Sequence, residues 1–354
     1  MPQIQTLNRN LVQVRGLSKK LDNPSVEDVR NFVHKVYSGV EYIPVEKGLE
    51  FGTDGRINGE YRFTASGLDS FLRFYGLNAG TIKQLWNADP EHCAQVLNTL
   101  MKEAEKTEKA QLVTNRGVIE GMVSKSYGVI ETPEVFDEFI KTNPNIDFVF
   151  AKFNGLNSRF VALPENPVVI EPKPGDSVKL GIDWHNGMAG RAAFDFNLML
   201  LRMACSNGCV LGDIAAGTKV RHIGGNAAER AIEGIAMQNA PVDEIQHGLK
   251  RATENHLGEN RMGFLTRKLR DYTTKRFSNS VVEEYDHPSL PDHYAGETQY
   301  DYWNAVTHKA KEAGDDQRGI ERAAWKLVTA ALPKETEFNR VRVDPPLTQQ
   351  MEEN

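Results

Sequence analysis

The amino-acid sequence predicts an α+β protein with a central antiparallel sheet flanked by N-terminal and C-terminal helices. Apolar residues recur at helical spacing before residue 109 and after residue 225, whereas β-branched runs broken by Asn-Gly pairs fill the stretch between. The chain has 354 residues, of which 40% are hydrophobic and 25% charged, so it has enough apolar material for a sizeable core. These proportions exclude wholesale disorder.

Residues 1–108 are expected to form a mainly helical N-terminal region. Apolar side chains within 26–36 keep helical spacing after Pro24, and those within 68–75 form one stripe that ends before a glycine. The strongest helix start is Asp89-Pro90-Glu91, because a capping carboxylate precedes a proline in the first turn.

Residues 109–280 are expected to hold the sheet together with a basic helix. The segment 111–130 is rich in β-branched residues and interrupted by glycines, which indicates a hairpin or a bulged strand pair. Two further strand pairs are expected around Asn154-Gly155 and Asn186-Gly187, because both residues of an Asn-Gly pair tolerate the positive φ of tight hairpin turns. An antiparallel sheet within residues 111–220 follows.

Helices are expected again after the sheet. Helical spacing is found in four segments: 226–238, 242–255, 300–313 and 317–331. The last two belong to a region of C-terminal helices, residues 281–332. Residues 279–297 lack a clear period and are expected to form a loop, and residues 333–354 are expected to form a flexible tail.

The net charge and the cysteine count limit the partners and the cellular compartment that we expect for the protein. The formal net charge is −6, so the overall field repels phosphate backbones and any nucleic-acid function requires a local basic surface. The three cysteines, Cys93, Cys205 and Cys209, are too few and odd in number for a disulfide framework. With no secretory signal and no apolar window of about 18 residues, we expect a cytoplasmic protein with no membrane partner. No cofactor is expected.

Several segments, in order along the chain, together have the arrangement of one family. They are Phe63–Gly67 through Leu97–Leu100, Gly117–Tyr127 with Glu134–Phe136, Gly175–Val178 with Asn186–Gly187, Arg202–Gly208 with Arg221–His222, and Trp303–His308 with Glu321–Trp325. In these segments the chain resembles the phage- and plasmid-like proteins grouped as domain of unknown function 932. The resemblance implies a phage or plasmid context, hence a bacterial host cytoplasm, and no settled activity. A remote relation to single-strand annealing proteins is one interpretation.

The sharpest local anomaly is a basic stretch over residues 261–276. It holds six Lys or Arg residues against one acid, Asp271, in a chain that is acidic overall. We expect one continuous helix over 258–277. Its inward stripe would hold Met262, Leu265, Leu269 and Tyr272, and a separate face would repeat Arg261, Lys268 and Lys275 every seven residues.

Such a surface can neutralise phosphates, with strong salt dependence, and its aromatic residues can stack on the bases of a single strand. The nucleic-acid-binding residues expected here are Arg261, Arg267, Lys268, Arg270, Tyr272, Lys275 and Arg276, with Phe264 and Phe277 as further stacking candidates. The alternative is a solvated helix face whose cations pair with carboxylates elsewhere in this acidic chain.

The segment 218–226 is a second candidate for nucleic-acid binding. Gly224-Gly225 precedes an expected helix, so backbone N–H groups at the helix start can hold an anion near Lys219, Arg221 and His222. The segment lacks the Lys-Ser/Thr ending of a P-loop and is no dinucleotide fingerprint. The alternative is a strand that leaves the sheet and turns into a capped helix.

Two groupings have metal or nucleophile interpretations. Cys205 and Cys209 with His185 and His222 suggest zinc, but their spacing is not that of paired ligands, so a packed cysteine pair at a strand end is favoured. A nucleophilic Cys205 with His222 lacks an orienting third group. Asp183 and His185 share a strand face, and with a neighbouring-strand carboxylate they can bind Mg²⁺ or transfer protons.

That carboxylate is Asp195, and residues of these types are also common on the solvent face of a sheet. A further polar trio, Asn304, Thr307 and His308, lies on one helix and is either a helix-packing network or a site.

Three functions stay open. The first is a nucleic-acid-binding accessory protein of phage or plasmid replication or recombination, which binds or anneals single-stranded DNA. The second is a phage protein-interaction or host-takeover factor that binds no nucleic acid. The third is a metal-dependent enzyme, although no specific catalytic motif is present and a binding role is favoured. A homo-oligomer is conceivable, because annealing proteins usually work as rings or filaments.

Overall fold

The computed structural model describes residues 11, 14–45, 49–103, 109–202, 207–210, 218–236, 242–287 and 297–333. The chain falls into two compact units, each built from three separate stretches. Unit 1 comprises Met1–Glu165, Asp183–Phe196 and Thr218–Gln238, and unit 2 comprises Asn166–Ile182, Asn197–Gly217 and Asn239–Asn354. The division into four consecutive regions that the sequence suggests, 1–108, 109–280, 281–332 and 333–354, remains a prediction.

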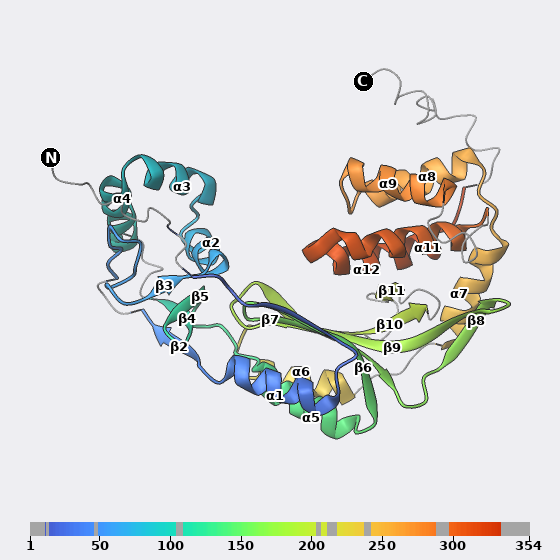
Figure 1. Ribbon diagram of the computed structural model, residues 1–354, viewed down its shortest axis with the longest axis horizontal. Helices are drawn as coiled ribbons and strands as arrows, with labels where there is room; N and C mark the ends of the chain where they lie inside the picture. The colour runs from blue at the N-terminus through green and yellow to red at the C-terminus, as the bar shows by residue number, and fades with distance from the viewer. Residues whose placement is uncertain are drawn as a thin grey trace, which may run out of the picture. The chain divides into compact units, whose positions relative to one another are not determined.

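Two sheets form the framework of the described residues (Figure 1). The larger has the strand order β1-β6-β7-β9-β10-β11, with β8 paired to β9 and β12 paired to β10. Its strands are β1 (Ser18–Asp22), β6 (Ile146–Asn154), β7 (Asn157–Pro164), β8 (Val169–Lys173), β9 (Asp176–Gly187), β10 (Ala192–Arg202), β11 (Asn207–Val210) and β12 (Thr218–Val220). The smaller, of order β2-β4-β5-β3, holds β2 (Val40–Pro44), β3 (Arg62–Phe63), β4 (Ala110–Asn115) and β5 (Val118–Ser124).

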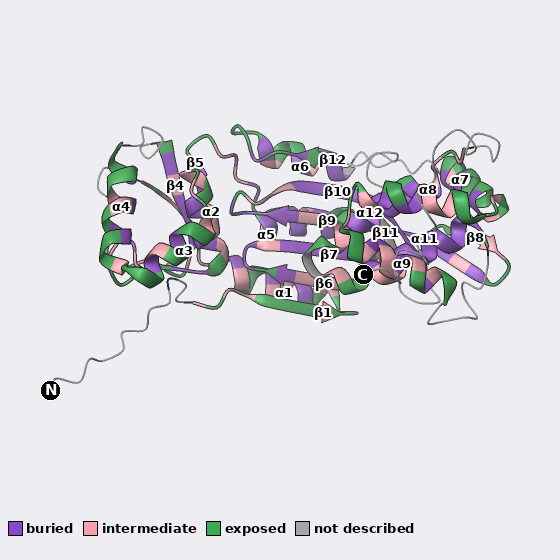
Figure 2. Ribbon diagram, turned by 90° about the horizontal axis from the view of Figure 1, so that it is seen from above, coloured by how far each residue is buried: buried purple, intermediate pink, exposed green. Residues whose placement is uncertain are grey.

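The pairing of these strands confirms the predicted α+β class with a mostly antiparallel sheet. β6 pairs with β7, β4 with β5 and β10 with β12 in antiparallel register, whereas β3 pairs with β5 in parallel. Figure 2 shows β9 and β10 buried along most of their length, as expected for strands inside the sheet rather than at its edge.

In unit 1 the smaller sheet packs with α2 (Ala65–Phe74), α3 (Ala79–Ala88) and α4 (Pro90–Glu103). Helix α2 begins at a Thr64 cap, whose hydroxyl accepts a hydrogen bond from the Gly67 N–H at 2.9 Å. A Cβ at Gly67 would lie 1.9 Å from the Ile119 carbonyl oxygen, so glycine lets α2 lie directly against β5. Phe63, Phe71 and other aromatic residues fill the core beneath.

Unit 1 also contains α1 (Val26–Tyr37), α5 (Thr132–Thr142) and α6 (Ala227–Ala236), of which α5 packs against both others (Figure 1). Ser25 and Asp28 form a reciprocal capping box at the start of α1. The core here is aromatic, with Trp184 stacked on Phe160 at a ring separation of 4.3 Å.

Unit 2 contains α7 (Val242–Glu254), α8 (Glu259–Arg270), α9 (Lys275–Asp286), α11 (Gln299–Ala310) and α12 (Gln317–Val328), with a 3₁₀ turn η2 (Lys311–Asp316) between the last two. Helix α11 packs against α7, α9 and α12, and with α12 it covers β11. Every residue from Gln299 to Thr307 is buried, so α11 is the central helix of this unit.

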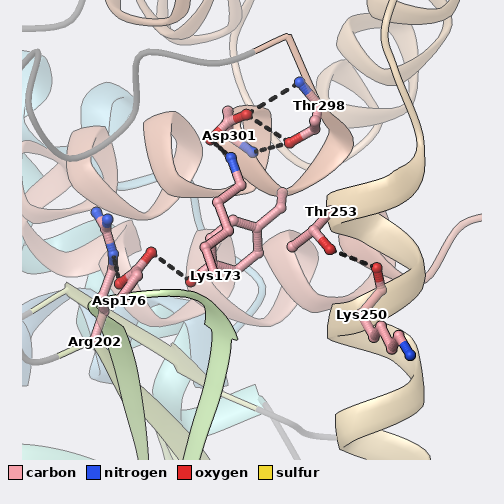
Figure 3. A network of polar contacts seen from close by, with 8 residues as sticks. Lys173, Asp176, Arg202, Lys250, Thr253, Thr298 and Asp301 are labelled. Carbon is pink, nitrogen blue, oxygen red and sulfur yellow. Dashed lines mark hydrogen bonds and ion pairs between the residues drawn. The ribbon is translucent and has the colours of Figure 1, made fainter.

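Buried polar contacts fasten α11 to the strands of unit 2 (Figure 3). Arg202 Nε lies 2.6 Å from Asp176 Oδ1, and the Tyr300 hydroxyl donates to the other oxygen of Asp176 at 2.9 Å. Lys173 Nζ lies 2.7 Å from Asp301, whose carboxylate also caps the start of α11. Each buried charge has a partner of opposite sign, which offsets its desolvation.

Local expectations are partly corrected. Asn186-Gly187 does not form the expected turn: both residues belong to β9, and the chain reverses over 188–191, where Gly190 has a φ of +73°. A contact with a distant part of the chain explains the difference: the buried Asn186 amide donates to the Ile130 carbonyl at 2.8 Å, which keeps Asn186 within the strand. The strands of the N-terminal region were missed, because β1, β2 and β3 are short.

The expected loop over 279–297 is wrong over its first part, since α9 continues to Asp286. Residues 288–296 of that loop, and residues 334–354 of the expected tail, lie outside the described residues. No helix among those described is long and apolar enough to cross a bilayer.

Candidate nucleic-acid interface

The basic stretch forms two helices instead of the one continuous helix expected. Helix α8 ends at Arg270, and α9 begins at Lys275 after a Thr274 cap that accepts from the Phe277 N–H at 3.2 Å. A threonine placed to cap a new helix competes with continuation of the old one. Lys275 therefore does not continue a face of Arg261 and Lys268, and the predicted seven-residue repeat is wrong at its third position.

The inward stripe is confirmed in part. Leu265 and Leu269 are fully buried, and Met262 packs against the same core. Tyr272 lies beyond the end of α8 and is 51% exposed, so its predicted inward position is wrong. Exposure is, however, what its other expected role requires, because stacking on a base needs a free ring face.

Four cations of the stretch are exposed, and none has an ion pair with a carboxylate of the described residues: Arg267, Lys268, Lys275 and Arg276. The ammonium group of Lys268 lies 5.2 Å from the ring centre of Phe264, one helical turn earlier. Within the part of the chain that the structure describes, these four cations do not show the carboxylate pairing that the alternative expected.

Arg261 and Arg270 have a different environment, because both are half-buried and bind neutral oxygens. Arg261 Nη1 donates to the His256 carbonyl at 3.0 Å, and Arg270 Nη2 donates to Asn279 Oδ1 at 3.2 Å. These bonds hold the start of α8 to the preceding loop and its end to α9. Because these hydrogen bonds involve no carboxylate, the charges of Arg261 and Arg270 are not cancelled by them and add to the positive potential around α8.

Sequence reasoning missed one cation beside this surface. Lys326 is an exposed residue of α12, and its ammonium group lies 5.8 Å from the ring centre of Tyr272. Helices α8 and α12 pack together, which brings the two residues close although 53 residues separate them. We call Arg267, Lys268, Tyr272, Lys275, Arg276 and Lys326 the basic-aromatic surface of unit 2.

The second candidate segment lies in unit 1, where β12 is followed by α6, as the strand-to-helix alternative expected. Lys219 is exposed on β12. Arg221 is exposed and His222 is 6% exposed, and both line a cavity that Lys219 does not line. The structure therefore brings together two of the three site residues expected in this segment.

In the Asp183, His185 and Asp195 grouping, both carboxylates are buried and the histidine is half-buried. Asp183 is fully buried and lies 2.5 Å from Arg159 Nε, and Asp195 is 4% exposed. Among the described residues no three His, Cys, Asp or Glu side chains gather as metal ligands. Asp183 acts as the buried partner of an arginine, so the metal-dependent enzyme gains no support here.

The remaining candidates are structural where they are described. Cys93 is a free, buried cysteine, whereas the predicted Cys205 pair falls on residues outside the described side chains. Asn304 and Thr307 are buried in the core of unit 2, and His308 lies 3.9 Å from Glu284. Burial lowers the pKa of His308. The helix-packing interpretation of this trio fits these positions.

The family model described as domain of unknown function (DUF932) matches residues 120–343. A search of curated proteins and a search of solved structures each found no match. The matched range includes both candidate segments, the central strands and α11.

Proposed function

The chain belongs to the domain of unknown function 932 family, whose description names no activity, so we propose a function from surface chemistry: the protein binds single-stranded nucleic acid through the basic-aromatic surface of unit 2. The observation that carries this proposal is the set of four exposed cations on α8 and α9 that have no carboxylate partner among the described residues.

Unpaired cations favour a polyanion for a thermodynamic reason. A phosphate backbone that meets Arg267, Lys268, Lys275 and Arg276 releases condensed counterions, and that release drives binding at low salt. Cations already paired with carboxylates would first have to break those pairs. The acidic remainder of the chain repels the backbone, which restricts binding to this surface.

The aromatic component favours single strands over duplexes. Tyr272 is 51% exposed, and a ring in that position can stack on an unpaired base, whereas bases within a duplex are already stacked. Lys268 over Phe264 and Lys326 over Tyr272 place a cation beside each ring. A cation that can bind phosphate therefore lies next to each ring that can stack on a base.

The biological setting follows from the family resemblance rather than from the surface. A phage- or plasmid-like protein that binds single strands fits an accessory role in replication or recombination, and annealing is the finer form of this proposal. Annealing requires two strands to be held at once, so we expect a homo-oligomer. Sedimentation with and without single-stranded DNA tests for it.

The test is fluorescence anisotropy of a labelled single-stranded DNA with the full chain at low salt. The variant R267Q/K268Q/K275Q/R276Q removes the four unpaired cations, and K19Q/R73Q/K102Q/K250Q removes four exposed cations on other elements as a matched control. We expect the first variant to lose at least about 100-fold in affinity and the control to lose far less, because the contacts are local.

No binding by the unaltered chain, or equal losses for the two variants, would contradict the proposal. Binding of RNA and DNA single strands with similar affinity agrees with it, because stacking and phosphate contacts do not read the sugar. If nuclease-treated host lysate yields an acidic protein that needs the same four cations while DNA does not bind, the protein-interaction alternative replaces it.

A further inference from the structure

Unit 1 contains a cavity of about 370 Å³ that is separate from the residues of the basic-aromatic surface. It is lined by the end of β5 (Met122–Ser124), by Tyr127, by the β9–β10 turn and the start of β10 (190–193), and by the Arg221–Ile223 segment after β12. No carboxylate is among the described residues that line it. A volume of this size lies within the range of small-molecule sites, about 300–1,000 Å³.

His222, one of the lining residues, carries a buried hydrogen-bond acceptor. His222 Nδ1 lies 3.1 Å from the Gly128 carbonyl oxygen, and because a carbonyl can only accept, Nδ1 carries the proton. Burial lowers the pKa of His222 to about 4, so the ring is neutral at pH 7 and Nε2 is an acceptor. That nitrogen is buried and has no hydrogen-bond partner among the described residues.

A buried acceptor without a donor loses its hydrogen bonds to water and so calls for an explanation. The Gly128 hydrogen bond holds the ring against a flip, and stacking on Tyr127 at 4.7 Å with the planes 2° apart holds its plane. Tyr127 is itself fixed: its hydroxyl donates to the Gly187 carbonyl at 3.0 Å and accepts from the Gly190 N–H at 3.2 Å. The acceptor is therefore held in place with its bonding capacity unused.

Positive charge lies beside this acceptor. Arg221 lines the cavity, is exposed, and has no ion pair with a described residue. Arg191 also lines it, but its Nη2 donates to the Ser66 carbonyl at 3.0 Å and its charge acts on the buried Glu120. Arg221 is thus the cation available to an anionic group, next to apolar lining from Met122, Val123 and the exposed Ile223.

We propose that this cavity binds a nucleotide, whose base or sugar donates a hydrogen bond to His222 Nε2 and whose phosphate is neutralised by Arg221. A nucleotide combines the three features that the wall requires: an N–H or O–H donor, a planar body for the apolar lining, and an anion. Inorganic phosphate offers no planar body, and a nucleoside offers no anion. The nucleotide comes either free or as the phosphorylated end of a strand.

Isothermal titration of the full chain tests the proposal with the four ribonucleoside 5′-monophosphates, the matching nucleosides and inorganic phosphate. We expect nucleotides to bind more tightly than both other probes. The variant R221Q should weaken nucleotide binding about 10-fold and leave nucleoside binding unchanged, since it removes a charged contact. The matched control is K219Q, because Lys219 is an exposed cation two residues away that does not line the cavity.

A second readout reports on His222 without replacing a buried residue. In ¹⁵N spectra of the imidazole, the Nε2 resonance should shift when a nucleotide binds and should not shift with inorganic phosphate. A 5′-phosphorylated tetranucleotide and its unphosphorylated form identify the source: only the phosphorylated end should compete with mononucleotide if strand ends are bound.

Three results would overturn the proposal: no nucleotide binding at millimolar concentration, phosphate binding as tight as nucleotide binding, or equal effects of R221Q and K219Q. The variant R267Q/K268Q/K275Q/R276Q separates this cavity from the proposed function, because it should lose single-strand binding and keep nucleotide binding. Each proposal can therefore fail without the other.

Discussion

Arginines in two regions of the molecule have opposite surroundings. Arg202 is 2% exposed and its guanidinium lies 2.6 Å from Asp176, inside the core of unit 2. Arg267, in the same unit, is exposed and has no carboxylate partner among the described residues. The first arginine pairs with Asp176, whose other oxygen accepts from the Tyr300 hydroxyl, whereas the second is exposed to solvent.

The difference shows that a cation's role follows from its partners rather than from its type. A buried guanidinium without its carboxylate leaves an uncompensated charge in the core, so the pair is needed for stability. An exposed cation contributes little to folding, because solvent already stabilises it. We therefore assign Arg202 to the fold and propose that Arg267 binds the ligand, and each prediction below tests that division.

The largest expected effect is on the buried pair. The substitution D176A leaves Arg202 buried without its carboxylate and should lower the free energy of unfolding by about 3–5 kcal/mol. Urea denaturation followed by circular dichroism measures it. A double variant, D176L/R202M, should be less destabilised than D176A, since it removes both charges; a loss in D176A below about 1 kcal/mol would contradict the role given to this pair.

The next effect concerns a buried group, His222, that has no ionic partner in the part of the chain that the structure describes. Burial lowers the pKa of His222 to about 4, from about 6.5 in an unfolded chain. Below about pH 6.5 the unfolded state therefore takes up a proton at His222 while the folded state does not. The free energy of unfolding is thus unaffected by protonation of His222 above that pH and falls as the pH is lowered toward 4.

This loss should reach up to about 3 kcal/mol at pH 4, and urea denaturation at several pH values measures it. The variant H222N keeps a side chain that can donate to the Gly128 carbonyl but does not titrate. It should be less stable at pH 7 yet show a flatter stability profile between pH 6.5 and 4. An unchanged profile would mean that His222 is not neutral in the folded protein.

A smaller effect is expected at the exposed ring of the basic-aromatic surface. The substitution Y272A should weaken single-strand binding by about 1–3 kcal/mol, because one base loses its stacking partner. Y272F should bind like the unaltered protein, since stacking needs the ring and not the hydroxyl. Anisotropy titrations measure both, and equal losses in the two variants would exclude stacking.

The smallest effect is on stability at the exposed arginine. R267Q should change the free energy of unfolding by no more than about 0.5 kcal/mol, because the side chain is solvated and unpaired. Urea denaturation in parallel with D176A gives the direct contrast. A loss comparable to that of D176A would show that Arg267 holds the fold.

Sequence patterns predicted the elements that rest on local signals. The hairpin of β4 and β5 turns at Arg116 and Gly117, both at positive φ, within the segment where glycine indicated a break. The start of α4 at Asp89-Pro90 was equally local, and Asp89 Oδ1 accepts from the His92 N–H at 3.0 Å. Caps and turns are specified by a few adjacent residues.

What depends on distant residues could not be predicted in this way. Asn186 looked like a turn residue but is buried, because Ile130 and Thr132 supply its hydrogen-bond partners. The exposed position of Tyr272 depends on where α8 ends, and Lys326 reaches it from another helix. Of the candidate site, the sequence predicted every cation except Lys326, and the packing determined which of the predicted cations have no carboxylate partner among the described residues.

The most direct test of the account is the salt dependence of single-strand binding. A log–log plot of the association constant against salt concentration should have a negative slope that becomes shallower by about 0.7 for each phosphate-contacting cation removed. We expect the slope to become shallower from the unaltered chain to R267Q, and shallower again in R267Q/K268Q/K275Q/R276Q. A slope that stays the same across these three proteins would contradict it.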